Sequence, residues 1–167
     1  MPILSAFAKK KKKEFFLEKI HKNKCILEIG SGSGWVGDYL KENGWTNYTG
    51  IDIVSPADIV GDIRNWKVIG LKEESFDIII AFEVVEHVDC FKECWALLKH
   101  NGMLMVTTPV PHMDWLLVIM EFLGLNQKRN SRHNNLIYLK NVSCFKNKKI
   151  KIMAFLSQWG ILIKDDL

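Results

Sequence analysis

A loop with three alternate glycines is the sequence feature that most constrains how this chain folds. It occupies residues 30–34, between the short apolar run 25–29 and the helix-forming segment 35–43. Glycine is needed where a chain turns sharply, often at positive φ, and where a ligand lies against the backbone. The pattern therefore predicts a buried strand, a tight ligand-binding turn and a helix, in that order.

An acidic residue follows this loop at a spacing that suits a nucleoside ligand. Asp52 stands about 20 residues further on, at the end of a predicted strand over residues 48–53. An ionised carboxylate only accepts hydrogen bonds, and a ribose offers two adjacent hydroxyl donors. Asp52 is therefore a candidate to bind the ribose of a cofactor that lies over the glycine loop.

Strands and helices alternate along the chain as far as residue 123. The other strands predicted in this part are residues 59–60, 76–82 and 103–108, and the other helices are residues 4–20, 91–98 and 114–123. Asp89 and Asp114 are expected to cap the last two helices, and Asn101-Gly102 to end the earlier of them. The alternation predicts an α/β fold with a doubly wound, mostly parallel sheet and helices on both faces.

The C-terminal segment follows a different pattern. Residues 150–155 and 161–163 are two β-forming runs, and the link Ser157-Gln158-Trp159-Gly160 is too short for a crossover helix. They predict an antiparallel hairpin, which completes a seven-stranded sheet. A chain of 167 residues suits one domain. We expect an N-terminal helix (4–20), a cofactor-binding core (24–110), a lid or substrate segment (111–149) and the hairpin (150–164).

The glycine loop alone leaves two cofactors open. Gly32-Ser33-Gly34-Trp35-Val36-Gly37 also fits the G-x-G-x-x-G fingerprint of dinucleotide-binding proteins, so a nicotinamide-dependent oxidoreductase is an alternative. Three observations weigh against it. The frame that begins at Gly30, with Glu28 two residues before it, starts directly at the strand end. The chain is short for a dinucleotide fold with a substrate domain, and it ends in a hairpin.

The loop and the segments after it resemble the motifs of class I S-adenosylmethionine-dependent methyltransferases. Glu28-Ile29-Gly30-Ser31-Gly32-Ser33-Gly34 is similar to the E/D-x-G-x-G-x-G signature, and Asp52 matches the acidic residue that binds the ribose in that family. Gly61-Asp62-Ile63 is similar to a later motif, in which an aspartate contacts the adenine amino group and the next backbone unit approaches the ring. The resemblance implies a Rossmann-like domain.

Two further segments extend the resemblance over about residues 20 to 110. Glu83-Val84-Val85-Glu86-His87-Val88 resembles the loop after the fourth strand, in the form typical of the small-molecule branch that includes quinone-biosynthesis enzymes. Leu97-Leu98-Lys99-His100-Asn101-Gly102-Met103-Leu104 resembles the helix-turn-strand region, with His100 and Asn101 in place of the usual proline and glycine. The segment 126–149 departs from the family because its helix looks short and polar.

The resemblance implies S-adenosylmethionine as cofactor, S-adenosylhomocysteine as product, and a small or lipid-like acceptor that is methylated on oxygen or carbon. The residues expected to bind the cofactor are Glu28, Gly30, Ser31, Gly32, Gly34, Asp52, Ile53, Asp62, Ile63 and Glu83. A catalytically silent cofactor-binding module is the alternative from another class of protein.

Methyl transfer from a sulfonium is an in-line displacement with a neutral leaving group, so alignment and exclusion of water are the main tasks. A base is needed only where the acceptor must lose a proton. His87 is the preferred base because histidine exchanges protons near neutral pH. Glu86 beside it is the second catalytic candidate.

The same segment raises the alternative of a metal site. Glu83, Glu86 and His87 with His112 or His133 resemble the E-x-x-E-H site that binds a divalent metal in small-RNA 2′-O-methyltransferases. An RNA-directed enzyme with such a site is therefore an alternative. The same letters occur in many metal-free relatives, so we expect no metal.

The remaining features bear on partners and location. The lysine run, residues 9–13, predicts a solvated helix face, with an acidic substrate, nucleic acid or an anionic membrane surface as alternatives. The apolar run 115–123 contains Glu121 and falls short of the ~20 residues that span a bilayer, so stable membrane insertion is not expected. No secretory signal is visible and the four cysteines do not form a zinc set. We expect a cytoplasmic monomer or homodimer.

Overall fold

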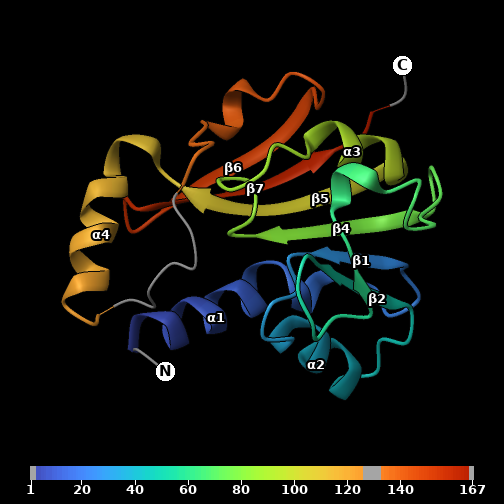
Figure 1. Ribbon diagram of the computed structural model, residues 1–167, viewed down its shortest axis with the longest axis horizontal. Helices are drawn as coiled ribbons and strands as arrows, with labels where there is room; N and C mark the ends of the chain where they lie inside the picture. Colours follow the sequence, from blue (N-terminus) through green and yellow to red (C-terminus); the bar gives the residue numbers. More distant parts are fainter. Residues whose placement is uncertain (1–2, 126–132, 166–167) are drawn as a thin grey trace.

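The computed structural model describes residues 3–125 and 133–165. Seven strands form one sheet in the order β3-β2-β1-β4-β5-β7-β6 (Figure 1). The parallel strands are β1 (Ile26–Ile29), β2 (Tyr48–Asp52), β3 (Ile59–Val60), β4 (Phe76–Phe82) and β5 (Leu98–Pro109). Strand β7 (Ser157–Ile163) runs antiparallel to both β5 and β6 (Asn147–Met153). The predicted fold class is confirmed.

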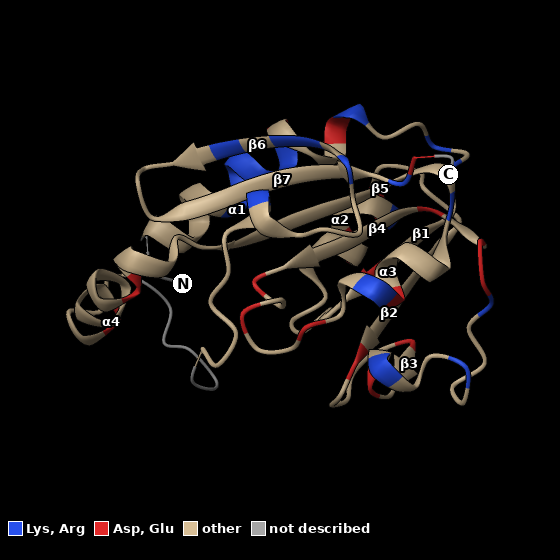
Figure 2. Ribbon diagram, turned by 90° about the horizontal axis from the view of Figure 1, so that it is seen from above, with Lys and Arg blue, Asp and Glu red and all other residues tan. Residues whose placement is uncertain are grey.

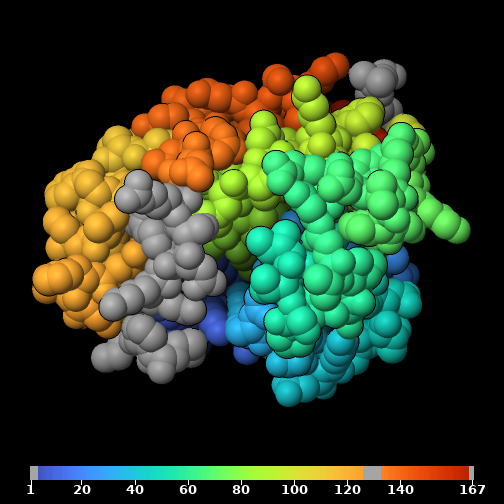
Figure 3. All heavy atoms as spheres, in the orientation of Figure 1, coloured from blue at the N-terminus to red at the C-terminus, as the bar shows by residue number. Residues whose placement is uncertain are grey.

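Helices cover the two faces of this sheet. Helix α1 (Ile3–Phe15) and helix α2 (Trp35–Glu42) lie on one face, and α3 (Phe91–Leu97) lies on the other (Figure 1). Successive strand residues point to opposite faces of the sheet, so that Ile26 packs in the cluster on the α1 face and Leu27 in the cluster on the α3 face. Helix α4 (Asp114–Phe122) forms one end of the molecule (Figure 3). None of the described helices is long and apolar enough to cross a membrane.

Several predicted boundaries were wrong. The first helix ends at Phe15, and Leu17–Lys19 forms a separate 3-10 turn. The helix that begins at Phe91 ends at Leu97, and Asn101-Gly102, expected to end it, lies within β5. Asp114 lies within α4, whose N-cap is Met113. The predicted lid segment 111–149 includes residues 126–132, which lie outside the described residues.

The C-terminal hairpin is present, but its turn lies elsewhere than predicted. The supposed link Ser157–Gly160 belongs to β7, and the chain reverses at Ala154 and Phe155, which have φ of 48° and 61°. Gln158 explains the difference, because its amide donates to the carbonyls of Pro109 and Ile137 at 2.9 and 2.8 Å. Gln158, which the sequence placed in a turn, is thus a buried strand residue whose side-chain amide is hydrogen-bonded.

Asp77 joins three neighbouring strands at the opposite edge of the sheet. Its carboxylate accepts the Cys25 N–H at 2.8 Å and the ammonium groups of Lys24 and Lys99 at 3.2 and 3.1 Å. Burial acts to raise the pKa of Asp77, but these three partners outweigh it and hold the pKa below its usual value. The ionised carboxylate therefore stabilises the fold above the unfolded pKa of ~3.9, and this contribution is lost as pH falls through the lowered folded pKa.

We predict that Asp77→Asn lowers the free energy of unfolding by about 1–3 kcal/mol at pH 7, because the Cys25 N–H and the two lysine ammonium groups lose a charged acceptor. Urea unfolding measured from pH 7 to pH 2.5 should show this deficit shrinking below pH ~4. Glu42→Gln, at an exposed position in α2, is the control and should change little. An Asp77→Asn protein as stable as the unmodified chain at pH 7 would contradict this role.

Candidate functional site

The glycine loop and Asp52 meet at the C-terminal edge of the sheet. Strands β1 and β2 are parallel neighbours with Ile29 opposite Ile51, so the loop after β1 reaches the end of β2. The Asp52 Oδ2 atom accepts the Gly32 N–H at 2.8 Å. The two elements are therefore close enough to contact one ligand, which the ribose hypothesis requires.

The other predicted loop residues shape the turn. The N–H groups of Gly30 and Ser31 both donate to the Ile51 carbonyl, at 2.8 and 3.2 Å. Gly30 has a φ of 71°, and a Cβ atom there would lie 2.5 Å from Cγ2 of Val84. Gly34, with a φ of 74°, is the N-cap of α2. Glycine at position 30 is thus required both by its backbone angle and by the close approach of the loop to the end of β4.

Glu28 lies buried in β1 beneath this loop and accepts a hydrogen bond from the Tyr48 hydroxyl. Burial raises the pKa of Glu28 to about 8, and Asp52 and Asp58 add to this rise while the Tyr48 bond opposes it. Glu28 therefore carries a proton at neutral pH. Its hydrogen bond to Tyr48 joins β1 to β2 close to where the loop begins.

Three predicted cofactor-binding residues, Ile53, Asp62 and Ile63, follow β2 and β3. The side chain of Ile53 is 73% exposed next to Asp52, whereas that of Ile63 is buried, so only the backbone of Ile63 can face a ligand. The Asp62 carboxylate accepts the Arg64 N–H at 2.9 Å and binds its guanidinium group at 2.5 Å. Arg64 holds the pKa of Asp62 below its usual value.

Glu83 follows β4 directly and has a strained backbone, with a φ of 56°. Such angles are uncommon outside glycine and gather at functional sites. Its Oε1 atom accepts bonds from the Lys12 ammonium at 2.9 Å and the Thr107 hydroxyl at 2.8 Å. Loss of solvent acts to raise the pKa of Glu83, but Lys12 and Thr107 lower it below its usual value.

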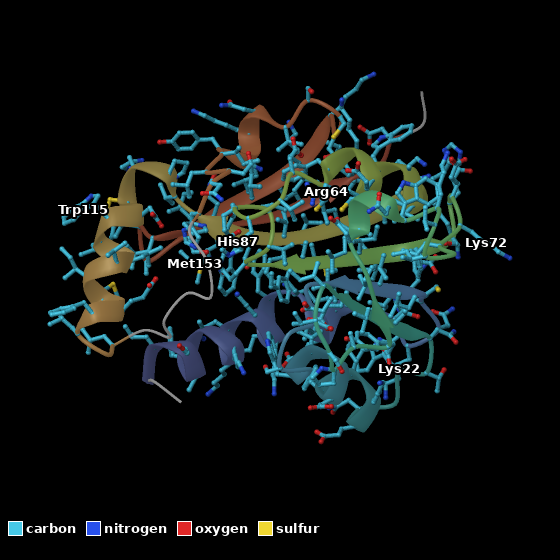
Figure 4. All side chains as sticks on the ribbon, in the orientation of Figure 1. Lys22, Arg64, Lys72, His87, Trp115 and Met153 are labelled. Atoms are coloured by element: carbon cyan, nitrogen blue, oxygen red, sulfur yellow. The ribbon has the colours of Figure 1, made fainter. Side chains whose placement is uncertain are left out.

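Glu86, His87 and His133 form a second group, called here the Glu–His cluster. One potential ligand atom from each lies within 4.8 Å of the others, and the two imidazole rings are 5.0 Å apart. Figure 4 places His87 near the arrowheads of β4 and β5. Glu86 is buried and accepts the Thr108 hydroxyl at 3.0 Å. Burial, and then the charge of Glu83, raise the pKa of Glu86 well above its usual value.

The two histidines considered for a metal site take different places. His133 joins the Glu–His cluster and is held by Asp114, 2.6 Å from its Nδ1 atom. His112 instead lies 2.8 Å from the Tyr138 hydroxyl. The described residues thus offer three ligands that could hold a cation, and the expectation that no metal is used stays a prediction.

An apolar pocket of about 690 Å³ lies beyond the end of β5. Its lining includes Val110, Tyr138, Lys140, Ile150, Ile152 and Phe155. Val110 of the lining directly follows β5, two residues after Thr108, whose hydroxyl donates to Glu86 of the Glu–His cluster. The pocket therefore begins at the same end of β5 as the cluster.

Sequence reasoning missed the residues that hold the acidic groups. Lys12, Thr107 and Thr108 contact Glu83 or Glu86 from α1 and β5. No local motif marks Lys12, because it lies among other lysines and its partner is 71 positions away. The two threonines precede the proline that ends β5, and in the sequence only this position at a strand end suggested that they lie near the site.

Comparison with known proteins agrees with this geometry. A family model described as a methyltransferase domain matches residues 4–143. The chain belongs to this methyltransferase domain family. The resemblance to class I S-adenosylmethionine-dependent enzymes is thereby confirmed, and the nicotinamide-dependent alternative is not favoured.

Individual relatives of this methyltransferase domain are distant. A ubiquinone biosynthesis O-methyltransferase from Histophilus somni is 29% identical over 120 residues, which cover 58% of the chain and 50% of that protein. The chain thus spans about half the length of this curated relative. Solved structures of the PH0226 protein from Pyrococcus horikoshii and of a SAM-dependent methyltransferase from Archaeoglobus fulgidus share the fold. The PH0226 protein is 16% identical with a TM-score of 0.66, and the match covers 95% of this chain and 90% of that one. The Archaeoglobus fulgidus protein is 16% identical with a TM-score of 0.67, and the match covers 95% of this chain and 94% of that one.

The packing at Gly30 can be tested against another glycine with a similar backbone. Gly70 has a φ of 83°, but a Cβ atom there would meet nothing within 4 Å. We predict that Gly70→Ala costs about 1 kcal/mol of unfolding free energy from backbone strain alone. Gly30→Ala should cost about 1–3 kcal/mol more, because the methyl group overlaps Val84.

Chemical unfolding of both variants, and of Gly30→Ala combined with Val84→Ala, separates the two effects. The combined variant should recover part of the loss, since a smaller residue 84 makes room for the methyl group. Equal losses of unfolding free energy in Gly30→Ala and Gly70→Ala would show that a methyl group at residue 30 does not overlap Val84.

Proposed function

We propose that this chain transfers a methyl group from S-adenosylmethionine to an oxygen or carbon atom of a small or lipophilic acceptor. The observation that carries the proposal is the direct bond between the glycine loop and Asp52. It supports a site in which the loop lies under the nucleoside and the Asp52 carboxylate accepts the ribose hydroxyls. Ile53 would then offer apolar contact to the adenine, and Asp62 and the Ile63 backbone would lie near its edge.

The sheet order gives the cofactor a direction. Strand β1 lies between β2 and β4, so a cofactor with its ribose at Asp52 would cross the glycine loop toward Glu83. The Glu–His cluster follows three residues later and would face the sulfonium end. Placing acceptor and methyl group there would supply the alignment on which this displacement depends.

We infer that His87 receives the proton of a hydroxyl acceptor. The acceptor oxygen would attack the methyl carbon while the carbon–sulfur bond breaks and its electron pair returns to sulfur. The acceptor proton would pass to His87, which leaves neutral S-adenosylhomocysteine and a methyl ether. Glu86, next to His87 in the chain and in the cluster, is the second candidate for this proton.

The apolar pocket and α4 support a lipophilic acceptor. The pocket is lined mainly by apolar side chains, among them Val110, Ile150, Ile152 and Phe155, and Lys140 also lines it. Helix α4 has no buried residue, and its Trp115 and Phe122 side chains are largely exposed. An acceptor with a hydrophobic tail would cover such surfaces while its reactive group reaches the Glu–His cluster.

A second candidate role for the cluster is to bind a divalent cation, which its three ligand atoms favour. A cation there would orient the acceptor oxygen and lower the pKa of a bound hydroxyl. An RNA would then be a candidate methyl acceptor, as well as a small molecule.

For cofactor binding, we predict that Asp52→Ala weakens the affinity for S-adenosylhomocysteine by about 10-fold or more, since it removes charge-assisted bonds worth about 1.5–3 kcal/mol each. Isothermal titration calorimetry measures this directly, with Glu73→Ala, an exposed carboxylate, as the matched control. Tight NADH binding without S-adenosylhomocysteine binding would overturn the proposal.

For catalysis, His87→Gln should lower methyl transfer about 100-fold or more, with affinity for S-adenosylhomocysteine within twofold. Radiolabelled S-adenosylmethionine and a series of phenols with lengthening alkyl chains provide the assay, and His21→Gln, at an exposed position, is the control. Turnover equal to that of the unmodified chain would remove His87 as the base. Loss of activity in EDTA, restored by Mg²⁺ or Zn²⁺, would favour the cation role instead.

A further inference from the structure

Helix α4 turns an apolar face to solvent. Its side chains Trp115, Val118, Ile119 and Phe122 follow the i, i+3, i+4, i+7 spacing that places residues on one face of a helix. They are 60, 48, 44 and 87% exposed, and no residue of α4 is buried. Contiguous exposed apolar surface marks sites where another protein or a membrane binds. This stripe is therefore a candidate docking surface.

Two other elements extend the α4 stripe. The turn between β6 and β7 presents Phe155, which is 80% exposed, and the start of α1 presents Leu4 and Phe7, which are 38 and 57% exposed. Figures 1 and 2 both place α4, this turn and the start of α1 at the same end of the molecule. These three side chains and the α4 stripe are called here the apolar end. A single acceptor tail covers only part of a surface that three elements share, so a larger partner is required.

Lysines gather on two elements next to the apolar end. Helix α1 and strand β6 together carry eight lysines and one acidic residue, Glu14 (Figure 2). Lys10, Lys149 and Lys151 are exposed, and these three are called here the basic side. Lys12 is buried, so the lysine run is only in part the solvated face that the sequence predicts.

Contacts between lysines and aromatic rings join the two surfaces. The Lys11 ammonium lies 5.8 Å from the ring centre of the exposed Phe7. The Lys151 ammonium lies 5.8 Å from the ring centre of Phe15, which connects β6 to the last residue of α1. Phe155 comes shortly after β6, the strand that holds Lys151. Exposed aromatic rings beside lysines are typical of segments that lie at the surface of an anionic bilayer.

We propose that the apolar end docks on a bilayer that carries anionic lipids. Its apolar side chains lie at the boundary between headgroups and acyl chains, and the lysines of the basic side meet the anionic headgroups. A second copy of the chain fits this surface less well, because a two-fold contact sets the same patch of both copies together and so opposes their lysines. Lysine is also depleted at protein–protein interfaces. Charge complementarity therefore favours the bilayer.

Docking at this end brings the apolar pocket to the lipid. Phe155 belongs both to the apolar end and to the lining of the pocket. A lipophilic molecule dissolved in the bilayer thus reaches the pocket without crossing water. The docking itself needs neither cofactor nor acceptor, so it goes beyond the proposed function and is tested without either ligand.

Co-sedimentation of the full chain with vesicles tests the docking. We predict binding to vesicles of phosphatidylcholine mixed with phosphatidylglycerol, and about 10-fold weaker binding or less to phosphatidylcholine alone. Ile119→Ser combined with Phe122→Ser should weaken binding to the mixed vesicles by about 10-fold or more, because it removes two apolar anchors. Val68→Ser is the control, since Val68 is as exposed as Phe122 but lies outside the apolar end, and it should change nothing.

A matched pair of lysine variants tests the electrostatic part. Lys151→Gln should weaken binding to the mixed vesicles about 5-fold, because it removes one charge that faces the anionic headgroups. Lys72→Gln should leave binding unchanged, since the exposed Lys72 lies at the end of the molecule opposite Trp115 (Figure 4). Equal binding by Lys151→Gln and the unmodified chain would remove the basic side from the docking surface.

Three outcomes would overturn the inference. The unmodified chain fails to bind the mixed vesicles, or the double serine variant binds them as tightly as the unmodified chain. In the third, analytical ultracentrifugation shows a dimer that the double variant dissolves, which would assign the apolar end to a second copy.

Fluorescence quenching repeats the test where the double variant fails to fold. Lipids with brominated acyl chains should quench the unmodified chain more than Trp115→Phe, and equal quenching would contradict the docking. Binding of S-adenosylhomocysteine is measured without vesicles, so failure of the docking and failure of the proposed function are distinguishable.

Discussion

The parallel pairing of β1 with β2 is the constraint on which the rest of the site depends. It sets Ile29 opposite Ile51 and so brings the glycine loop to the end of β2. The bond from Gly32 to Asp52 follows from that register. A slip of one residue would turn Asp52 to the other side of the sheet, and the loop would lose its acidic partner.

The same edge of the sheet gathers ionisable groups that a core would not tolerate without partners. Glu28 is buried and protonated in β1, while Glu83 is ionised beside Lys12, and Glu86 is buried close to Glu83. Such perturbed groups cost stability and cluster where a protein does chemistry. Asp77, at the opposite edge, is a contrast, because its three donors hold it ionised away from the glycine loop.

Sequence reasoning was successful where the signal is local. The glycine loop, Asp52 and the buried strands follow from turn chemistry and apolar runs, which fix backbone shape within a few residues. It was wrong at Ser157–Gly160 because the partners of Gln158 come from residues distant in the sequence. It missed Lys12 for the same reason, since nothing in a row of lysines shows which one is buried. From the sequence, His112 and His133 were equal candidates for a metal site, and the fold places His133 beside Glu86 and His87.

A crystal structure with bound S-adenosylhomocysteine would show whether the glycine loop and Asp52 hold one nucleoside. Both ribose hydroxyls should lie within hydrogen-bonding distance of the Asp52 carboxylate, with the nucleoside over residues 30–34. Ligand density in the apolar pocket or elsewhere, with Asp52 still bound only to the Gly32 amide, would contradict it.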